Sequence, residues 1–241
     1  MNGYRKEYKY IVGDDVLRDV KNRIQDVMHV DEHQNGDFYR IRSIYLDSPS
    51  YQCLRENQAG ISTREKYRIR AYDLSEDKIS AEIKIRHNET ISKMSADISR
   101  DTLESILAGD YVGAPIALGR DKSNYIDNEL AAKTLDRYMI KIAGEHYSPA
   151  VIVEYERSAY IYEMCNVRIT FDRNVMASTD YSHFFDTELN TVPAIMGGQH
   201  VLEIKYDEFL PPEITSLLSG MGLERCSCSK YVRSLKSVGI S

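Results

Sequence analysis

Residues 62–87 read STREKYRIRAYDLSEDKISAEIKIRH and decide the fold, because they hold two runs in which charged and mostly apolar side chains alternate. Successive side chains of a strand point to opposite faces, so each run predicts a strand with one ionic and one apolar face. The segment 73–77 between the two runs predicts a turn. The ionic faces carry Arg64, Lys66, Arg68 and Arg70 in the first run and Ser80, Glu82, Lys84 and Arg86 in the second.

The same alternation recurs in three other segments, 4–12, 167–173 and 200–207, which are therefore also predicted to be strands. Each of them again places most of its charged side chains on one face. These ionic faces carry Arg5, Glu7 and Lys9 in the first segment, Arg168, Thr170 and Asp172 in the second, and Glu203, Lys205 and Asp207 in the third.

The remaining pattern predicts three more strands and several helices around them. The segment 178–199 contains Gly197-Gly198 and is either a connecting loop or a flap over a tunnel mouth, since glycine permits both. A loop is expected around Gly113, Pro115 and Gly119. The strands are expected at 38–47, 90–97 and 151–163, and the helices at 14–29, 101–109, 124–142, 211–219 and 229–237. The helix 124–142 offers Ile126, Leu130, Leu135, Tyr138 and Ile142 as core positions.

Strands at both ends of the chain, with helices between them, predict one α+β domain over residues 1–241 whose sheet is closed by the two halves together. Helices would cover the apolar side, so the closed sheet would enclose its ionic side. A barrel interior of this kind cannot be a dry core, because unpaired buried charge is too costly. We therefore expect an interior that is wet or that holds a ligand of complementary charge.

The composition describes an ordinary folded protein: 42% of the residues are hydrophobic, 28% are charged, and the net charge is -6. A negative total argues against a general nucleic-acid binder, which is usually basic. We expect neither a transmembrane helix nor a signal peptide, because no apolar run approaches the necessary length. These features predict a cytoplasmic protein whose four cysteines are reduced thiols.

The cations on the predicted inner face point to a polyanionic ligand, because arginine and lysine are the residues that suit phosphate oxygens. The carboxylates among them suggest a divalent cation, since Mg²⁺ and Mn²⁺ combine one or two carboxylates with phosphate oxygens. Phosphoryl transfer requires groups of these kinds. The sequence holds no P-loop motif, so any phosphate site must be built differently.

Seven short motifs occur in order over about residues 4–235. They are Glu7-Tyr8-Lys9-Tyr10, Tyr67-Arg68-Ile69-Arg70, Glu82-Ile83-Lys84, Glu156-Arg157-Ser158-Ala159-Tyr160, Arg168-Ile169-Thr170-Phe171-Asp172, Leu202-Glu203-Ile204-Lys205-Tyr206 and Ser229-Lys230-Tyr231. With these motifs the sequence resembles the polyphosphate polymerase domain of the vacuolar transporter chaperone (VTC) proteins, within the triphosphate tunnel metalloenzyme (CYTH-like) superfamily.

The resemblance implies a closed eight-stranded antiparallel β-barrel that forms a tunnel with flanking helices. It also implies a reaction that moves the γ-phosphate of ATP onto a polyphosphate chain, with Glu203 as a ligand of Mn²⁺ or Mg²⁺. The implied phosphate-binding residues are Lys9, Arg68, Arg70, Lys84, Arg157, Arg168 and Lys230. We add Lys205, which shares a face with Glu203, and the supporting residues Glu7, Glu82, Arg86 and Asp172.

Two positions depart from what the superfamily and a regular strand would give. The tunnel hydrolases open with Glu-x-Glu-x-Lys, but Arg5 stands here where the first carboxylate would be, which favours the polymerase branch. Arg157 is out of phase with Glu154 and Glu156, and a bulge near Glu156 would bring the three to one face.

Three functions fit these observations. The first is an ATP-dependent polyphosphate polymerase, the second a tripolyphosphate or nucleoside triphosphate hydrolase, and the third a non-catalytic polyphosphate-binding module. The eukaryotic polymerases also carry an SPX domain and membrane helices that 241 residues cannot hold. We therefore expect no membrane segment in this chain, although a separate membrane partner remains open.

Overall fold

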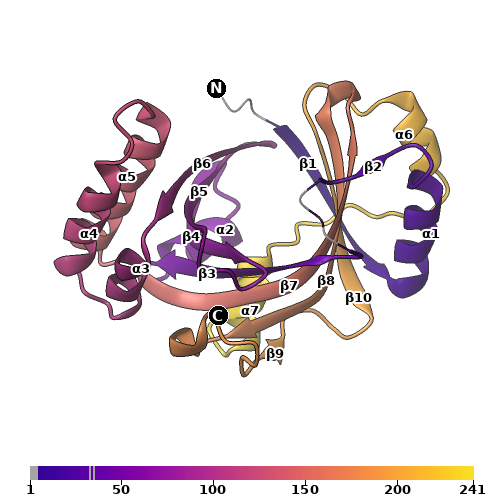
Figure 1. The fold of residues 1–241 in the computed structure, drawn as a ribbon. Coiled ribbons are helices and arrows are strands. Elements are labelled where there is room, and N and C mark those ends of the chain that lie inside the picture. The colour runs from indigo at the N-terminus through magenta and orange to yellow at the C-terminus, as the bar shows by residue number, and fades with distance from the viewer. Residues whose placement is uncertain (1–4, 33, 35) are drawn as a thin grey trace.

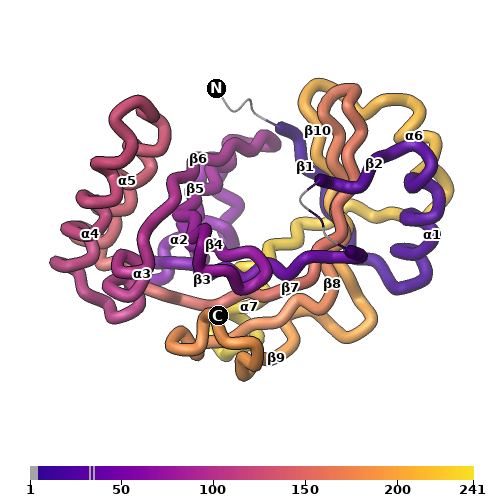
Figure 2. The backbone as a smooth tube through the Cα atoms, viewed as in Figure 1, coloured from indigo at the N-terminus to yellow at the C-terminus, as the bar shows by residue number. Residues whose placement is uncertain are grey.

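The computed structural model describes residues 5–32, 34 and 36–241, so residue 4, the predicted start of the first strand, lies outside the described residues. Its centre is a ring of antiparallel strands, seen end-on in Figures 1 and 2. Around the ring the strands follow the order β7-β3-β4-β5-β6-β1-β10-β8, and β8 pairs with β7 to close it. The ring strands are β1 (Arg5–Gly13), β3 (Tyr39–Asp47), β4 (Thr63–Tyr72), β5 (Ile79–His87), β6 (Thr90–Ile98), β7 (Ser148–Tyr162), β8 (Val167–Ser178) and β10 (Gln199–Tyr206).

This closed, eight-stranded ring confirms the predicted fold class. Two short strands, β2 (His29–Val30) and β9 (Val192–Pro193), pair with β7 and β8 outside the ring order. The pairing of β1 with β6 is brief and joins only Arg5 to Ile91 and Lys6 to Thr90. The chain that leads into the last helix then contacts β1, where the backbone N–H of Cys226 donates to the carbonyl of Lys9 at 2.9 Å.

Helices pack against the outer, apolar face of the ring in two groups (Figure 1). Each group forms its own hydrophobic core with the strands beneath it. A buried Leu or Ile side chain in such a core contributes about 1.5–3 kcal/mol. One group is α1 (Asp14–Ile24) and α6 (Pro212–Leu218), and the other is α3 (Arg100–Leu107), α4 (Gly113–Lys122) and α5 (Glu129–Glu145).

Two short helices, α2 (Gln52–Gln58) and α7 (Lys230–Ser237), are joined through one buried carboxylate. Asp47 accepts hydrogen bonds from the backbone N–H groups of Cys53 and Leu54 in the first turn of α2. The same side chain accepts a hydrogen bond from the hydroxyl of Tyr231 in α7. This link fixes the start of α7, and therefore Lys230, relative to the ring.

The predicted loop around Gly113, Pro115 and Gly119 is wrong, because these residues belong to α4. Proline is tolerated in the first turn of a helix, where its missing N–H has no helical partner to bond. The side chain of Asp110 accepts from the N–H groups of Val112 and Gly113 at 3.1 and 2.7 Å, which caps this turn.

The helix predicted from residue 124 begins later, at Glu129, behind the capping side chain of Asn128. Ile126 and Leu130 were expected in the core but are 89% and 42% exposed, because the first precedes the helix and the second lies on its outer side. Leu135, Tyr138 and Ile142 are buried as predicted. Of the two alternatives for segment 178–199, the packing favours a connecting segment, since Phe184 and Ile195 are buried in the larger core.

Candidate active site

The interior of the ring holds a cavity of about 560 Å³ whose wall is strongly basic. Twelve basic and three acidic side chains of the described residues line it, which gives the wall a formal net charge of +9. Because the whole chain carries -6, the remaining residues together carry a net charge of -15. The cations are Lys6, Lys9, Arg64, Lys66, Arg68, Arg70, Lys84, Arg86, Arg157, Lys205, Arg225 and Lys230, and the acids are Glu7, Glu89 and Glu203.

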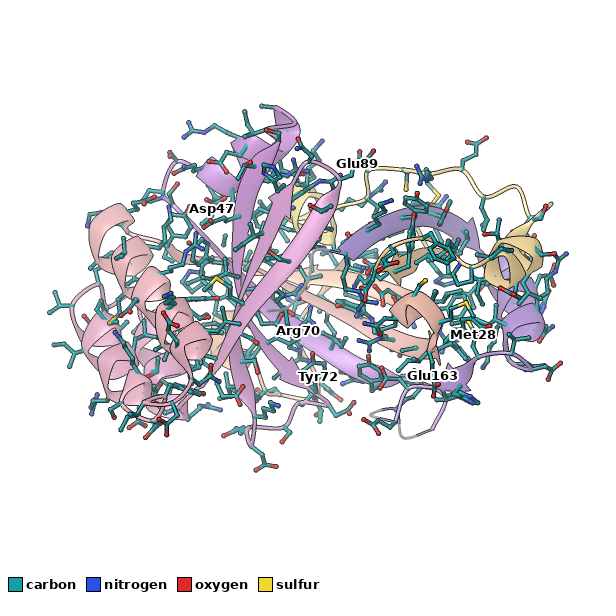
Figure 3. All side chains as sticks on the ribbon, turned by 90° about the horizontal axis from the view of Figure 1, so that it is seen from above. Met28, Asp47, Arg70, Tyr72, Glu89 and Glu163 are labelled. Atoms are coloured by element: carbon teal, nitrogen blue, oxygen red, sulfur yellow. The ribbon has the colours of Figure 1, made fainter. Side chains whose placement is uncertain are left out.

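The cavity runs along the ring from the β5–β6 turn. Glu89 marks this turn at one end of the ring in Figure 3, and Tyr72 lies toward the opposite end. Arg70 lies between them, on the same strand as Tyr72. The β4 side chains at every second position therefore follow the length of the cavity, as the alternation in the sequence predicted.

Glu203 lies in the wall of this cavity, where it contacts three lysines, and it is only 3% exposed. Its carboxylate oxygens lie 2.8 Å from Nζ of Lys230, 3.0 Å from Nζ of Lys9 and 3.1 Å from Nζ of Lys205. Burial acts to raise the pKa of Glu203, but Lys230, Lys9 and Lys205 outweigh it and hold that pKa well below its usual range. This carboxylate is therefore ionised and orients three ammonium groups.

Glu7, on the neighbouring strand β1, orients lysines in the same way. Its carboxylate lies 3.1 Å from Nζ of Lys84, 3.5 Å from Nζ of Lys9 and 3.6 Å from Nζ of Lys205. Burial opposes ionisation, but Lys84 and Lys9 lower the pKa of Glu7 far below its usual value. Lys9 and Lys205 thus bridge the two carboxylates, and both strands of the β1–β10 pair contribute to one network.

Two further carboxylates, those of Glu82 and Asp172, form ion pairs with arginines of the cavity wall. Glu82 accepts from Nε and Nη2 of Arg68 at 2.7 and 2.6 Å. Asp172 accepts from Nε and Nη2 of Arg157 at 2.6 and 2.7 Å, and it also contacts Nζ of Lys230. Such two-point contacts fix the plane of a guanidinium group and leave its other N–H donors available.

The outer face of the ring supports this arrangement. The hydroxyl of Tyr138 in α5 donates to the backbone carbonyls of Arg68 and Glu82, at 2.6 and 3.0 Å. The backbone of the paired strands is therefore tied to a fully buried helix residue behind the site. On the cavity side, Arg70 donates to the hydroxyls of Ser43 and Tyr155, at 3.2 and 3.4 Å.

The remaining five cavity cations have no carboxylate oxygen within 4 Å among the described residues. Nζ of Lys6 donates to the carbonyl of Glu208, Nε of Arg86 donates to that of Asn88, and the guanidinium of Arg225 lies over the ring of Tyr8. We call these five the outer cations and the other seven the inner cations. The outer cations are Lys6, Arg64, Lys66, Arg86 and Arg225.

The structure brings most of the sequence-predicted site residues together. Those that line the cavity are Lys9, Arg68, Arg70, Lys84, Arg157, Lys205, Lys230, Glu203, Glu7 and Arg86. Glu82 and Asp172 stand behind the wall, where they hold Arg68 and Arg157. Arg168 is not among the lining residues, because Asp31 holds it at 2.6 Å and it donates to the hydroxyl of Tyr39.

The phase of Arg157 resolves without the bulge that would bring Glu154 and Glu156 to its face. Arg157 alternates regularly with Tyr155, and both line the cavity. Glu154 instead pairs with Arg42, and Glu156 accepts from the amide of Asn174. The β7–β8 register does shift near Glu156, as expected, but the extra residue lies on β8, because Glu154 pairs with Met176 and Glu156 with Arg173. The shift therefore leaves the alternation of β7 unchanged.

Several lining residues were not proposed from the sequence as site residues. Arg64 and Lys66 lie on the same β4 face as Arg68 and Arg70, so the alternation already contained their signal. Tyr45 and Tyr155 belong to strands whose apolar character hid their position. Arg225 lies outside any helix or strand, and no pattern in the sequence could have placed it.

The donor set can be compared with the expected divalent ion. No three His, Cys, Asp or Glu side chains of residues 5–32, 34 and 36–241 form a group that could hold a metal ion. Glu203 nevertheless presents a carboxylate at the cavity wall, and Mg²⁺ commonly combines one or two carboxylates with water and phosphate oxygens. Both oxygens of this carboxylate already contact lysines, so the binding of Mn²⁺ or Mg²⁺ at Glu203 stays a prediction.

The match to a family model decides the identity of the domain: the model for the VTC domain matches residues 4–239. The chain belongs to the VTC domain family. A search of curated proteins finds no match to its sequence. Six of the seven ordered motifs of this VTC domain contribute residues to the lining of one cavity.

Solved structures show the same fold at low identity. A candidate adenylate cyclase from Vibrio parahaemolyticus is 11% identical, with a TM-score of 0.51 over 97% of this chain and 98% of that one. A candidate adenylate cyclase from Bacillus halodurans is 14% identical, with a TM-score of 0.52 over 95% and 96% of the two chains. The VTC domain thus shares its fold with these two structures. None of the helices among the described residues is both long and apolar enough to cross a membrane.

Proposed function

We propose that this VTC domain is an ATP-dependent polyphosphate polymerase that acts in the cytoplasm. Its substrates would be ATP and the end of an inorganic polyphosphate chain, and its products ADP and a chain longer by one phosphate. The observation that carries the proposal is the charge of the cavity, where twelve cations face three acids. A narrow basic interior inside an acidic exterior suits a thin phosphate chain and disfavours bulk nucleic acid.

The inner cations would bind the triphosphate of ATP and the terminal phosphate of the chain. Each ammonium group has three donors and each guanidinium five, so they can keep their carboxylate contacts and still donate to phosphate oxygens. Lys9, Lys205 and Lys230 would surround the phosphoryl group near Glu203. Arg68 and Arg157 would hold neighbouring phosphates, because Glu82 and Asp172 already fix their planes.

Transfer in this arrangement needs position and charge more than it needs a protein nucleophile. A terminal oxygen of the polyphosphate forms a bond to the γ-phosphorus of ATP. The bond between that phosphorus and the β–γ bridging oxygen breaks, and its electron pair leaves with ADP. The attacking oxygen is already an anion, so no side chain has to remove a proton.

Glu203 is the residue that would hold the divalent ion, Mn²⁺ or Mg²⁺, against the phosphates. The ion would supply further charge neutralisation on phosphoryl oxygens. The lysines around Glu203 would then turn toward the phosphates while staying inside the same network. Their task is to align the two substrates and to balance the charge that develops on the transferred group.

One assay tests the proposal: purified protein is incubated with ATP, Mn²⁺ and short polyphosphate, and ADP, free phosphate and chain-bound phosphate are measured together. A polymerase gives ADP matched by chain-bound phosphate. Free phosphate without chain growth would identify a hydrolase and overturn the proposal. Tight polyphosphate binding without any ADP would instead identify a binding module.

A further inference from the structure

Lys66 differs from every inner cation in the chemistry of its partners. Its Nζ donates to the hydroxyl of Ser229, the N-cap of α7, at 2.8 Å and lies 5.6 Å from the ring centre of Tyr231. The Asn57 amide completes the set in the orientation that points its oxygen inward, where it accepts from Nζ of Lys66 and Nε of Arg64 at 3.1 Å. All three partners of Lys66 are neutral.

The charged groups that face Lys66 leave its ammonium group unbalanced. Burial, followed by the charges of Lys9 and Arg64, lowers the pKa of Lys66 to about 7, against a smaller opposing effect of Cys53 and Glu7. Lys9, by contrast, has a raised pKa, because Glu203 and Glu7 outweigh its burial. Burial also lowers the pKa values of Lys84 and Lys205, although Glu7 and Glu203 act to raise both. What distinguishes Lys66 from all of these lysines is that its contacts among the described residues are neutral groups.

We propose that Lys66, Asn57 and Ser229 form a subsite for one phosphate of the polyphosphate chain, and that filling it is coupled to proton uptake. The inference rests on the proposed function, since it takes the ligand to be polyphosphate. An ammonium group, a hydroxyl and an amide that can turn its NH₂ inward are all donors to phosphate oxygen. The three side chains come from β4, the end of α2 and the start of α7, and they meet at the cavity wall.

The coupling follows from charge balance. A bound phosphate supplies the negative charge that no carboxylate provides here, so it favours the ammonium form of Lys66. As pH rises through about 7, free protein loses this proton, and binding must recover it. The contribution of Lys66 to polyphosphate affinity should therefore fall about tenfold between pH 6 and pH 8.

Calorimetric titration of the full chain with long-chain polyphosphate, without ATP, tests the subsite at both pH values. Lys66→Arg keeps a permanent charge, whereas Lys66→Met removes it; Lys133→Met, an exposed lysine of α5, is the matched control. The protonation of the polyphosphate itself changes the affinity of every variant by the same factor, so it cancels in the ratio of two affinities measured at one pH. Repeating the titration in buffers of different ionisation enthalpy gives the number of protons taken up on binding, because the measured binding enthalpy changes with the buffer in proportion to that number.

The proposal predicts that the affinity of wild type relative to Lys66→Arg falls about tenfold from pH 6 to pH 8. At pH 6, Lys66→Met should bind at least several-fold more weakly than wild type, while Lys133→Met should bind like wild type. Removing an unbalanced buried cation should also raise the melting temperature of Lys66→Met, more at pH 6 than at pH 9. The unfolded lysine keeps its proton up to about pH 10, whereas folded Lys66 loses it near pH 7, so the penalty on the folded state is full below pH 7 and shrinks as the pH rises above it.

Equal pH dependence in wild type and Lys66→Arg would overturn the inference, as would unchanged affinity in Lys66→Met at pH 6. Either result would leave the proposed function standing if wild type binds polyphosphate and extends it. If wild type binds no polyphosphate at pH 6, the proposed function fails with it. The two failures are therefore distinguishable in one set of measurements.

Discussion

The seven inner cations of the cavity share four carboxylates, whereas the five outer cations have none within 4 Å among the described residues. In the inner set, Glu203 and Glu7 form ion pairs with lysines, and Glu82 and Asp172 form ion pairs with arginines. In the outer set, Arg86 and Lys6 donate to backbone carbonyls. Both sets line one continuous cavity, so they differ in their counter-charges and not in their access to a ligand.

This difference separates two tasks. A buried ion pair adds little net stability, because desolvation offsets the attraction, but it holds its side chains in one geometry. The inner set is therefore organised before any phosphate arrives, which is what group transfer requires. The outer set lacks negative charge and would gain it from a ligand that extends beyond the triphosphate. A polyphosphate chain would satisfy both sets, and a nucleotide alone would satisfy the inner one.

The largest expected effect comes from the centre of the inner set. Glu203→Gln removes the charge that orients Lys9, Lys205 and Lys230, and with it the proposed metal ligand. We expect ADP formation to fall at least about 100-fold, the usual cost of losing one preorganised electrostatic group. The measurement is the initial rate at saturating Mn²⁺, with the exposed Glu213→Gln as the control. Retained activity at saturating metal would contradict the role of Glu203.

The next effect concerns an arginine and its holding carboxylate. Arg68→Ala removes a fork of donors and leaves Glu82 buried with one partner fewer. We expect polyphosphate affinity to fall about 30-fold, equivalent to about 2 kcal/mol. Calorimetry measures the affinity, a melting curve confirms that the variant folds, and the exposed Arg120→Ala serves as the matched control. An unchanged affinity in a folded Arg68→Ala would remove this arginine from the site.

The outer cations should matter less, and their effect should depend on salt. Arg64→Ala and Arg86→Ala each remove a partly hydrated charge, whose attraction to a polyanion is screened. We expect each to weaken binding of long polyphosphate about threefold at low salt, and the loss to shrink at high salt. The affinity of each variant relative to wild type is measured at two ionic strengths. A loss of affinity that does not change with salt would assign these residues to the inner, desolvated set.

The smallest effect is expected at Arg168, where the family resemblance and the geometry differ. The resemblance implies a phosphate contact, but Asp31 and Tyr39 hold this side chain outside the lining of the cavity. We expect Arg168→Ala to change polyphosphate affinity by no more than about twofold, because this side chain is held away from the cavity by its ion pair with Asp31. A loss comparable to that of Arg68→Ala would show that Arg168 swings into the cavity when the chain binds.

The alternation in residues 62–87 was enough to predict two strands with one ionic and one apolar face, because period two fixes which side chains share a face. The closure of the sheet was inferred from the strands at both ends of the chain, and the eight-stranded barrel was implied by the family resemblance. The alternation also placed Arg64 and Lys66 beside Arg68 and Arg70. Helix α4 was missed because Pro115 and two glycines suggest a loop, whereas the capping by Asp110 is a contact that composition does not reveal.

The ordered motifs also predicted most of the inner site, but not how its charges are arranged. Glu82 and Asp172 were expected as supporting residues, yet only the folded ring shows them behind Arg68 and Arg157. Some counter-charges come from strands that are distant in sequence, since Glu203 of β10 contacts Lys9 of β1 and Glu7 of β1 contacts Lys84 of β5. The pairing that separates the inner from the outer cations therefore depends on the closed ring. For the same reason, the unbalanced position of Lys66 could not be inferred from its neighbours along the chain.

The most direct test of the inner and outer sets compares tripolyphosphate with longer polyphosphates, in wild type and in the double variant Arg64→Ala/Arg86→Ala. The account predicts that wild-type affinity rises with chain length and that the double variant loses this gain while binding tripolyphosphate as tightly as before. Equal affinity of wild type for short and long chains, or an equal loss for both ligands in the variant, would contradict the account.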